Sequence, residues 1–164
     1  MAGIKQDQPL VPSLLDRLLD DEPENKREAP KSRNQVIREL KLSVRRDLEN
    51  LLNTRYRCEV WPPELDELEL SLINYGIPDF TGANLGLTKT REEFRRVIET
   101  IVKKFEPRFK TVKVIGLDNT EPLDRTMRFR IDAMLHADPA PEPVVFDSAL
   151  EPATGMFEVK GQGR

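Results

Sequence analysis

Apolar residues recur at helical spacing in the first two thirds of the chain and at strand spacing in the last third. Within residues 34–52 the apolar positions are Val36, Ile37, Leu40, Val44, Leu48, Leu51 and Leu52. This spacing puts them on one side of a helix and predicts the first major core helix. Ser32 and Gln35 have the spacing of a capping box, which predicts that this helix starts beside them.

A second core helix is predicted further along by the same spacing. Its apolar stripe consists of Phe94, Val97, Ile98, Ile101, Val102 and Phe105. Thr90 and Glu93 form a second capping-box pattern at its start. We expect the helix to end near Glu106, because Pro107 has no N–H to donate and disfavours helical geometry in the residue before it.

Beyond Pro107 the apolar period changes from helical spacing to two. Val112 and Val114 alternate with polar neighbours, and residues 127–135 alternate over their whole length. Residues 144–148 and 155–160 are two further short strand candidates. Helices followed by a strand meander predict an α+β fold: two main helices packed on a small antiparallel sheet of three to four strands.

The segment between the two core helices has no sustained period. Prolines and glycines mark turns around a short predicted helix at residues 68–74, so we expect an ordered connection. Trp61, Tyr75 and Phe80 lie in this segment. Because aromatic side chains bury large areas, we expect these three to close an edge of the core and not to stack on a ligand.

The start of the chain predicts a separate amphipathic helix. After Pro12 and Ser13, which suit a helix start, leucines cluster on one side: Leu14, Leu15, Leu18 and Leu19. Residues 22–31 are polar and bounded by prolines, which is typical of a flexible linker. We therefore divide the chain into residues 1–31, a tethered helix with its linker, and residues 32–164, the folded domain. The leucines should dock on this domain or, as we favour, on a neighbouring protein.

Composition limits the compartment and the kind of partner. With 38% hydrophobic and 34% charged residues, the 164-residue chain should be a soluble single domain with a tail. No apolar run approaches the roughly 18 residues of a membrane helix, and the first residues lack a signal-peptide pattern. We expect a cytoplasmic protein without direct membrane insertion.

The distribution of charge favours protein partners over nucleic acid. A net charge of −3 lacks the basic excess that phosphate binding requires. Between Glu59 and Asp79 there are six acidic residues and no basic one, whereas Lys89 to Lys104 holds six basic residues and three acidic. Such segregation suits complementary patches on protein partners, although a solvated helix face explains the basic segment equally well.

Few residues offer catalytic or metal-binding chemistry. Cys58 and His136 are the only residues of their kinds, so neither a disulfide nor a cysteine cluster is possible within the chain. The sequence has no HExxH motif, glycine-rich phosphate loop or nucleophile elbow, and we expect no cofactor and no metal. His136 is most simply a residue at the surface end of a strand. A glycosidase-like pair of carboxylates stays open, because the chain has 29 acidic residues.

The sequence FEPRF at residues 105–109 raises a specific problem. A carboxylate at a helix C-terminus faces the negative end of the helix dipole, which disfavours it by roughly 0.3–1 kcal/mol when it is exposed. We therefore expect a cation close to Glu106. Three interpretations of Glu106 and Arg108 follow: an internal salt bridge, a clamp for a partner protein, or half of a catalytic pair.

Five stretches resemble the TssE family, the small baseplate subunits of bacterial type VI secretion systems. They are PSLLDRLLDDEP (12–23), DLENLLNTR (47–55), SLINYGIPDF (71–80), IETIVKKFEPRF (98–109) and PAPEPVVFDSALEPATGMFEVK (139–160). The family is similar to a wedge protein of contractile phage baseplates that was once labelled a lysozyme. A further relative of this domain is an anti-adaptor that binds a response regulator.

The resemblance implies a structural part in a contractile injection machine. It implies that Glu106, Pro107 and Arg108 help attach the chain to the TssF and TssG wedge proteins, among baseplate neighbours that include TssK. It also implies a fold similar to the sheath-subunit domain and a link to the first ring of the TssB/TssC sheath. On this basis we favour a partner clamp at Glu106 and Arg108 over an internal salt bridge, and both over catalysis. An anti-adaptor or a peptidoglycan glycosidase is the alternative.

Overall fold

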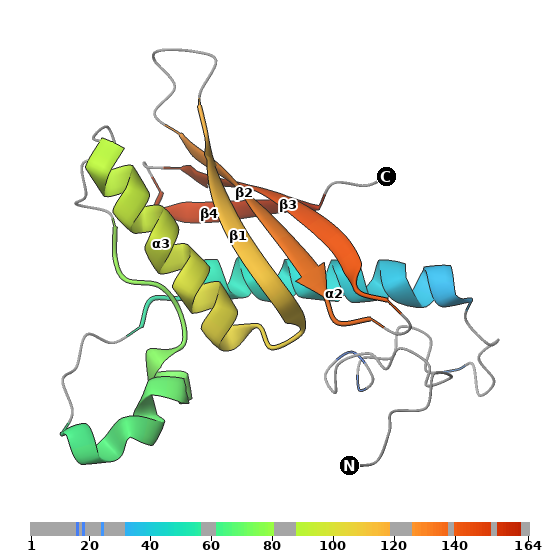
Figure 1. Cartoon of the computed structure of the whole chain (residues 1–164), viewed down its shortest axis with the longest axis horizontal. Coiled ribbons are helices and arrows are strands. Elements are labelled where there is room, and N and C mark those ends of the chain that lie inside the picture. Colours follow the sequence, from blue (N-terminus) through green and yellow to red (C-terminus); the bar gives the residue numbers. More distant parts are fainter. Residues whose placement is uncertain are drawn as a thin grey trace.

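The computed structural model describes residues 16, 18, 24, 32–56, 62–80, 88–118, 126–137, 140–151 and 154–161 (Figure 1). Its helices are α2 (Arg33–Asn53), the 3-10 helices η1 (Pro63–Leu70) and η2 (Leu72–Asn74), and α3 (Thr88–Phe105). Its strands are β1 (Phe109–Leu117), β2 (Met127–Leu135), β3 (Glu142–Glu151) and β4 (Met156–Gly161). The strands form one antiparallel sheet in the order β1-β2-β3-β4, which confirms the predicted α+β fold.

Helix α2 forms as the sequence predicts. The Ser32 hydroxyl accepts a hydrogen bond from the Gln35 N–H, and the Gln35 side chain accepts one from the Ser32 N–H, so the capping box is confirmed. The apolar stripe turns toward the sheet, where Val44, Leu48 and Leu52 are fully buried. The helix packs mainly along β4.

Helix α3 covers the other end of the sheet, along β1. Its predicted start was wrong, because the helix begins at Thr88 and Thr90 is already helical. Glu93 lies 4.0 Å from Lys89 one turn away, so its side chain pairs along the helix. The end is as predicted: the helix stops at Phe105, before Glu106 and Pro107.

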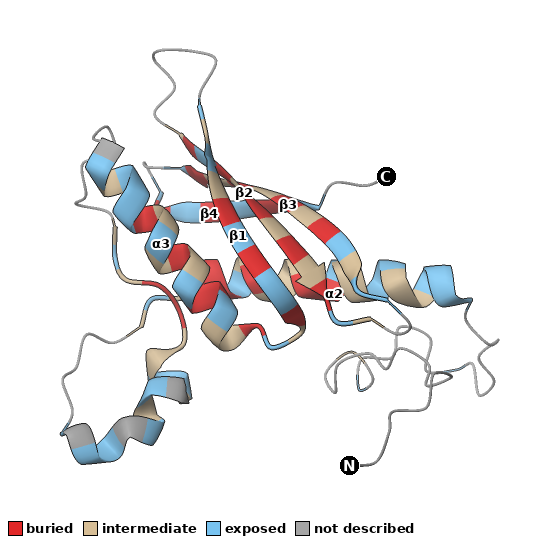
Figure 2. Cartoon of the chain, in the orientation of Figure 1, coloured by how far each residue is buried: buried red, intermediate tan, exposed pale blue. Residues whose placement is uncertain are grey.

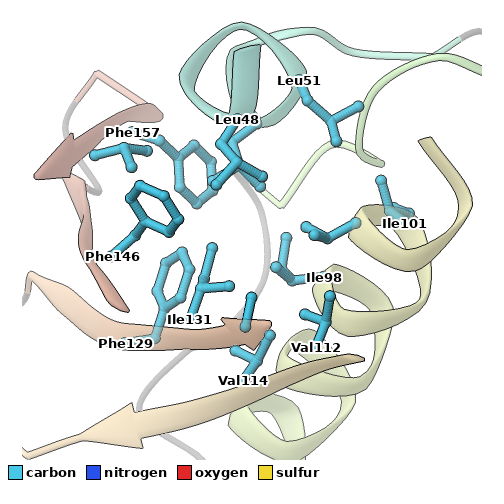
Figure 3. Packing of buried hydrophobic residues seen from close by; sticks show 14 of the residues in the cluster. Leu48, Leu51, Ile98, Ile101, Val112, Val114, Phe129, Ile131, Phe146 and Phe157 are labelled. Atoms are coloured by element: carbon cyan, nitrogen blue, oxygen red, sulfur yellow. The ribbon is translucent and has the colours of Figure 1, made fainter. Parts of the chain in front are cut away.

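Both helices and the inner face of the sheet share one hydrophobic core. Inward-facing residues of β2 and β3 are buried while their neighbours are partly exposed, as the alternating colours of Figure 2 show. The aromatic rings of Phe94, Phe129 and Phe157 meet at centroid distances of 5.7–6.1 Å. Figure 3 shows Phe129, Phe146 and Phe157 together on the sheet side of this core.

The described part of the connection between α2 and α3 joins the core at Gly76 and Ile77. Gly76 has a φ of 120°, and a side chain there would meet the Thr54 carbonyl oxygen at 2.5 Å, so the position requires glycine. Ile77 is fully buried and donates its N–H to the Thr54 oxygen at 2.9 Å. Tyr75 and Phe80 pack against the core as predicted, whereas Trp61 lies outside the described residues.

Side chains from the helices hold both outer strands of the sheet. The Asn53 amide accepts the Phe157 N–H at 2.8 Å and donates to the Phe157 carbonyl at 2.9 Å on β4. On β1, Glu99 accepts the Val114 N–H at 3.1 Å and Arg95 donates to the Val114 carbonyl at 3.1 Å. At these positions the edge groups that could pair with another strand are already bonded.

Three residues of the predicted N-terminal unit are described. Asp16 and Leu18 are helical, in agreement with the predicted amphipathic helix, and Glu24 lies in a turn. Leu14, Leu15 and Leu19 lie outside the described residues, as does most of the predicted linker.

Candidate partner-binding site

The site is the corner where α3 turns into β1. Helix α3 ends with the Glu106 N–H donating to the Val102 carbonyl at 2.9 Å, and the Glu106 carbonyl accepts the Phe109 N–H at 3.2 Å. Pro107 stands between them in the turn and is exposed. The tight turn brings the side chains of Glu106 and Arg108 together, as the hydrogen bonds between them show.

Glu106 and Arg108 form a two-pronged ion pair. The Arg108 Nε donates to Glu106 Oε1 at 2.6 Å, and Nη2 donates to the second carboxylate oxygen. The Arg108 backbone N–H adds a third bond to Oε1 at 3.2 Å. Only 5% of Glu106 is exposed, so a buried carboxylate is held by a planar guanidinium fork.

The same guanidinium reaches across to α2. Its Nη2 donates to Asp47 Oδ2 at 2.6 Å, and its Nη1 donates to the Ser43 hydroxyl at 3.1 Å. Burial lowers the pKa of Arg108, but the hydrogen bonds that it donates to the Glu106 and Asp47 carboxylates outweigh burial and raise that pKa above its ordinary value. Arg108 therefore carries a permanent charge that ties the corner to α2.

Asp16 extends this network toward the N-terminus of the chain. The Ser43 hydroxyl donates to Asp16 Oδ2 at 2.6 Å, and Arg46 Nη2 donates to Asp16 Oδ1 at 2.8 Å. Because Ser43 also accepts from Arg108, one hydroxyl joins the corner to the N-terminal segment. We call the set Glu106, Arg108, Asp47, Ser43 and Asp16 the corner network.

The corner network settles part of the problem posed by the sequence. The cation expected near Glu106 is Arg108, which confirms that prediction. The two side chains bind each other, which is the internal salt bridge that we had ranked below a partner clamp. Pro107 is exposed and 23% of the Arg108 side chain remains accessible, so contact of this corner with another protein stays a prediction.

The remaining predicted site residues divide into described and undescribed positions. Leu18 is 72% exposed, so it does not pack into the core of its own domain. His136 is exposed just beyond β2, where its N–H donates to the Arg108 carbonyl at 2.8 Å, as expected for a strand-end residue. Sequence reasoning missed Ser43, Asp47 and Asp16; the signal for Ser43 was a hydroxyl residue beside Val44 on the buried side of α2.

These features define a class of protein. Charged side chains are used to brace a corner, and among the described residues no group of three or more His, Cys, Asp or Glu could hold a metal ion. No helix in the described part of the chain is long and apolar enough to cross a membrane. The arrangement is that of an α+β domain in which a network of charged and polar side chains braces the corner between α3 and β1.

Comparison with known proteins gives the family. The sequence matches the family of the baseplate wedge protein gp25 over residues 38–140, more than half of the chain, and the chain belongs to that family. The matched region starts within α2, includes the corner and ends between β2 and β3. Neither a curated protein nor a solved structure matched significantly. The protein is therefore a structural component of a phage-tail-like baseplate, which confirms the family predicted from the sequence.

Proposed function

We propose that the chain is the TssE-type subunit of a type VI secretion baseplate. In this role it links the TssF/TssG wedge, with TssK nearby, to the first ring of the TssB/TssC sheath, and it acts in the cytoplasm. The family match supports the baseplate role, and the TssE-like stretches at residues 12–23 and 139–160 extend the resemblance beyond the matched region. Nucleic acid and direct membrane insertion have no part in it.

The observation that carries the proposal is the corner network. Glu106 and Arg108 fix each other, and Asp47 and Ser43 fix Arg108 to a core helix. Pro107 therefore lies on a turn whose backbone is already ordered before a partner binds. Binding a partner there costs less ordering entropy than binding through a free loop, which is why a braced corner is a good attachment point.

The N-terminal helix supplies a second part of the same attachment surface. Asp16 is bonded to Ser43 and Arg46 of α2 next to the corner, while Leu18 remains 72% exposed. An exposed leucine on a segment anchored by its polar side is placed to enter an apolar pocket of a neighbour. We propose that Leu14, Leu15 and Leu19 act with Leu18, and that residues 1–31 form an attachment unit distinct from residues 32–164.

The geometry of the corner also supports a non-enzymatic role. A general acid needs a carboxyl group that reaches substrate, but both Glu106 oxygens are bound by Arg108 and the residue is buried. We expect no release of soluble muropeptides from peptidoglycan above the buffer background. Turnover that disappears in Glu106→Gln with unchanged folding would contradict the structural role.

Binding to a reconstituted TssF/TssG complex tests the proposal. Leu18→Ser should keep the parent melting temperature, because the side chain is exposed, and should weaken binding about tenfold. Met156→Ser is the matched control, since Met156 is 55% exposed on β4 and lies in a different element. Deletion of residues 1–28 should lower the melting temperature by only a few degrees and weaken binding further. No binding by the parent chain would refute the proposed function.

A further inference from the structure

Exposed apolar side chains gather in one part of the described structure. Of the six large hydrophobic residues that are exposed there, three lie within residues 62–74: Leu65 at 49%, Leu72 at 87% and Ile73 at 44%. The other three are Leu18 near the N-terminus, Leu42 on α2 and Met156 on β4. Single exposed apolar residues are normal, but a local group of them marks an interaction surface.

This segment stands apart from the two layers of the domain. Figure 1 shows η1 and η2 below α3 and away from the sheet. The two 3-10 helices contact mainly each other, and their hydrogen bonds are local: Ser71 Oγ donates to the Leu68 carbonyl at 2.7 Å and accepts the Ile73 N–H at 3.3 Å. The segment therefore has an internal shape that the core does not impose.

Its base is nevertheless fixed to the domain. Next to η2, Tyr75 packs edge-on against Phe105 with ring centroids 5.4 Å apart. Two residues further along the chain, Ile77 pairs with the end of α2. Lys104 on α3 lies 3.9 Å from Glu69. A projecting segment with a fixed base can present apolar side chains in a defined direction.

The charge of the segment limits what can cover it. Residues 62–74, which we name the acidic arm, contain four acidic residues and no basic one. Glu64, Glu67 and Glu69 are exposed around the leucines. A partner surface that covers Leu65 and Leu72 must also lie against these carboxylates. It therefore needs lysine or arginine beside its apolar part, because the carboxylates would otherwise be buried without a counterion.

The most basic helix of a second copy, α3, does not offer such a surface. Its Lys103 and Arg95 already pair with acidic residues of the same helix at 2.7 and 2.8 Å. None of the exposed large apolar residues of the described structure lies on α3. Basic charge and accessible apolar area are therefore not combined there.

We propose that the acidic arm docks into an apolar groove rimmed by lysine and arginine on another protein of the baseplate. Leu72, the most exposed of the large apolar residues, enters the groove, and Glu64 and Glu67 pair with its rim. This inference rests on the proposed function, which supplies the assembly in which the arm is covered. The arm and the corner network have no residue in common, so variants of one leave the side chains of the other unchanged.

The experiment uses the full chain with a reconstituted TssF/TssG complex as the probe. A photo-crosslinking residue in place of Leu72 should attach to the complex, and the same residue in place of Met156 should not. The double variant Leu65→Ser, Leu72→Ser should keep the parent melting temperature and lose at least tenfold in affinity. The charge reversal Glu64→Lys, Glu67→Lys should weaken binding at low salt, and the difference from the parent should shrink as salt rises.

The outcomes separate the two proposals. If the parent chain binds but the leucine double variant binds equally well and position 72 forms no crosslink, the arm inference is wrong and the proposed function stands. If the parent chain does not bind, both fall. A crosslink from position 72 to a second copy of the chain would overturn the choice of partner. Equal salt dependence of the parent and the charge-reversed variant would overturn the basic rim.

Discussion

Replacement of Arg108 by alanine removes the centre of the corner network. The guanidinium donates to Glu106, Asp47 and Ser43, and no other side chain among the described residues joins all three. In the parent chain Glu106 is 5% exposed, and truncation leaves its carboxylate with the backbone N–H of residue 108 as its remaining described donor. The variant therefore carries a buried charge that has lost its counterion.

The expected cost follows from the burial of the pair. Removing one partner of a buried ion pair costs about 3–5 kcal/mol, and we take the lower end because 23% of the Arg108 side chain is accessible. A loss of about 3 kcal/mol in a domain of this size lowers the melting temperature by roughly 10 °C. A purely partner-facing arginine would instead cost less than about 0.5 kcal/mol.

Chemical denaturation of the parent and the variants measures this effect. Arg130→Ala is the matched control: Arg130 pairs with Asp147 at 2.9 Å, but both side chains are more than a third exposed, so its loss should cost at most about 1 kcal/mol. Glu106→Gln added to Arg108→Ala should recover part of the lost stability, because the uncompensated charge is gone. If Arg108→Ala is no more destabilising than Arg130→Ala, the corner network is not a brace.

Three further variants test other contacts of the fold. Asn53→Ala should cost about 1–3 kcal/mol in denaturation, since two main-chain groups of β4 lose their partner; an unchanged midpoint would contradict this. The hydrogen bond from Lys103 lowers the pKa of Glu99 below its ordinary 4.5, so its stabilisation is complete above that pH and lost as pH falls through the lowered pKa. The stability gap to Glu99→Gln should therefore close in acid, and a constant gap would refute the assignment. Gly76→Ala should cost more than about 1 kcal/mol because of its φ of 120° and the Thr54 contact; a neutral effect on thermal melting would show that the turn adapts.

The regular elements were predictable because their signals are local. The apolar spacing of residues 34–52 and the alternation of residues 127–135 each specify one buried face, and the observed α2 and β2 agree with them within one residue at each end. The start of α3 was not predictable in the same way. A threonine followed three residues later by glutamate also occurs inside a first turn, where Glu93 pairs with Lys89.

The corner shows where sequence reasoning stops. Glu106 could be singled out because a carboxylate at a helix end violates a local electrostatic preference, and Arg108 stands two residues away. Asp47 and Ser43 are 61 and 65 residues from Arg108, so only the packing of α2 beside the corner brings them together. The sequence alone could therefore not show that Glu106 and Arg108 form an internal brace with α2.

An electron cryomicroscopy structure of the chain bound to the reconstituted TssF/TssG complex tests the central claim most directly. The account predicts that the wedge contacts the turn at Pro107 and the exposed side of Leu18, with the Glu106–Arg108 pair and its bonds to α2 intact. A complex in which this corner faces solvent, or in which Arg108 leaves Glu106 to bind the wedge, would contradict it.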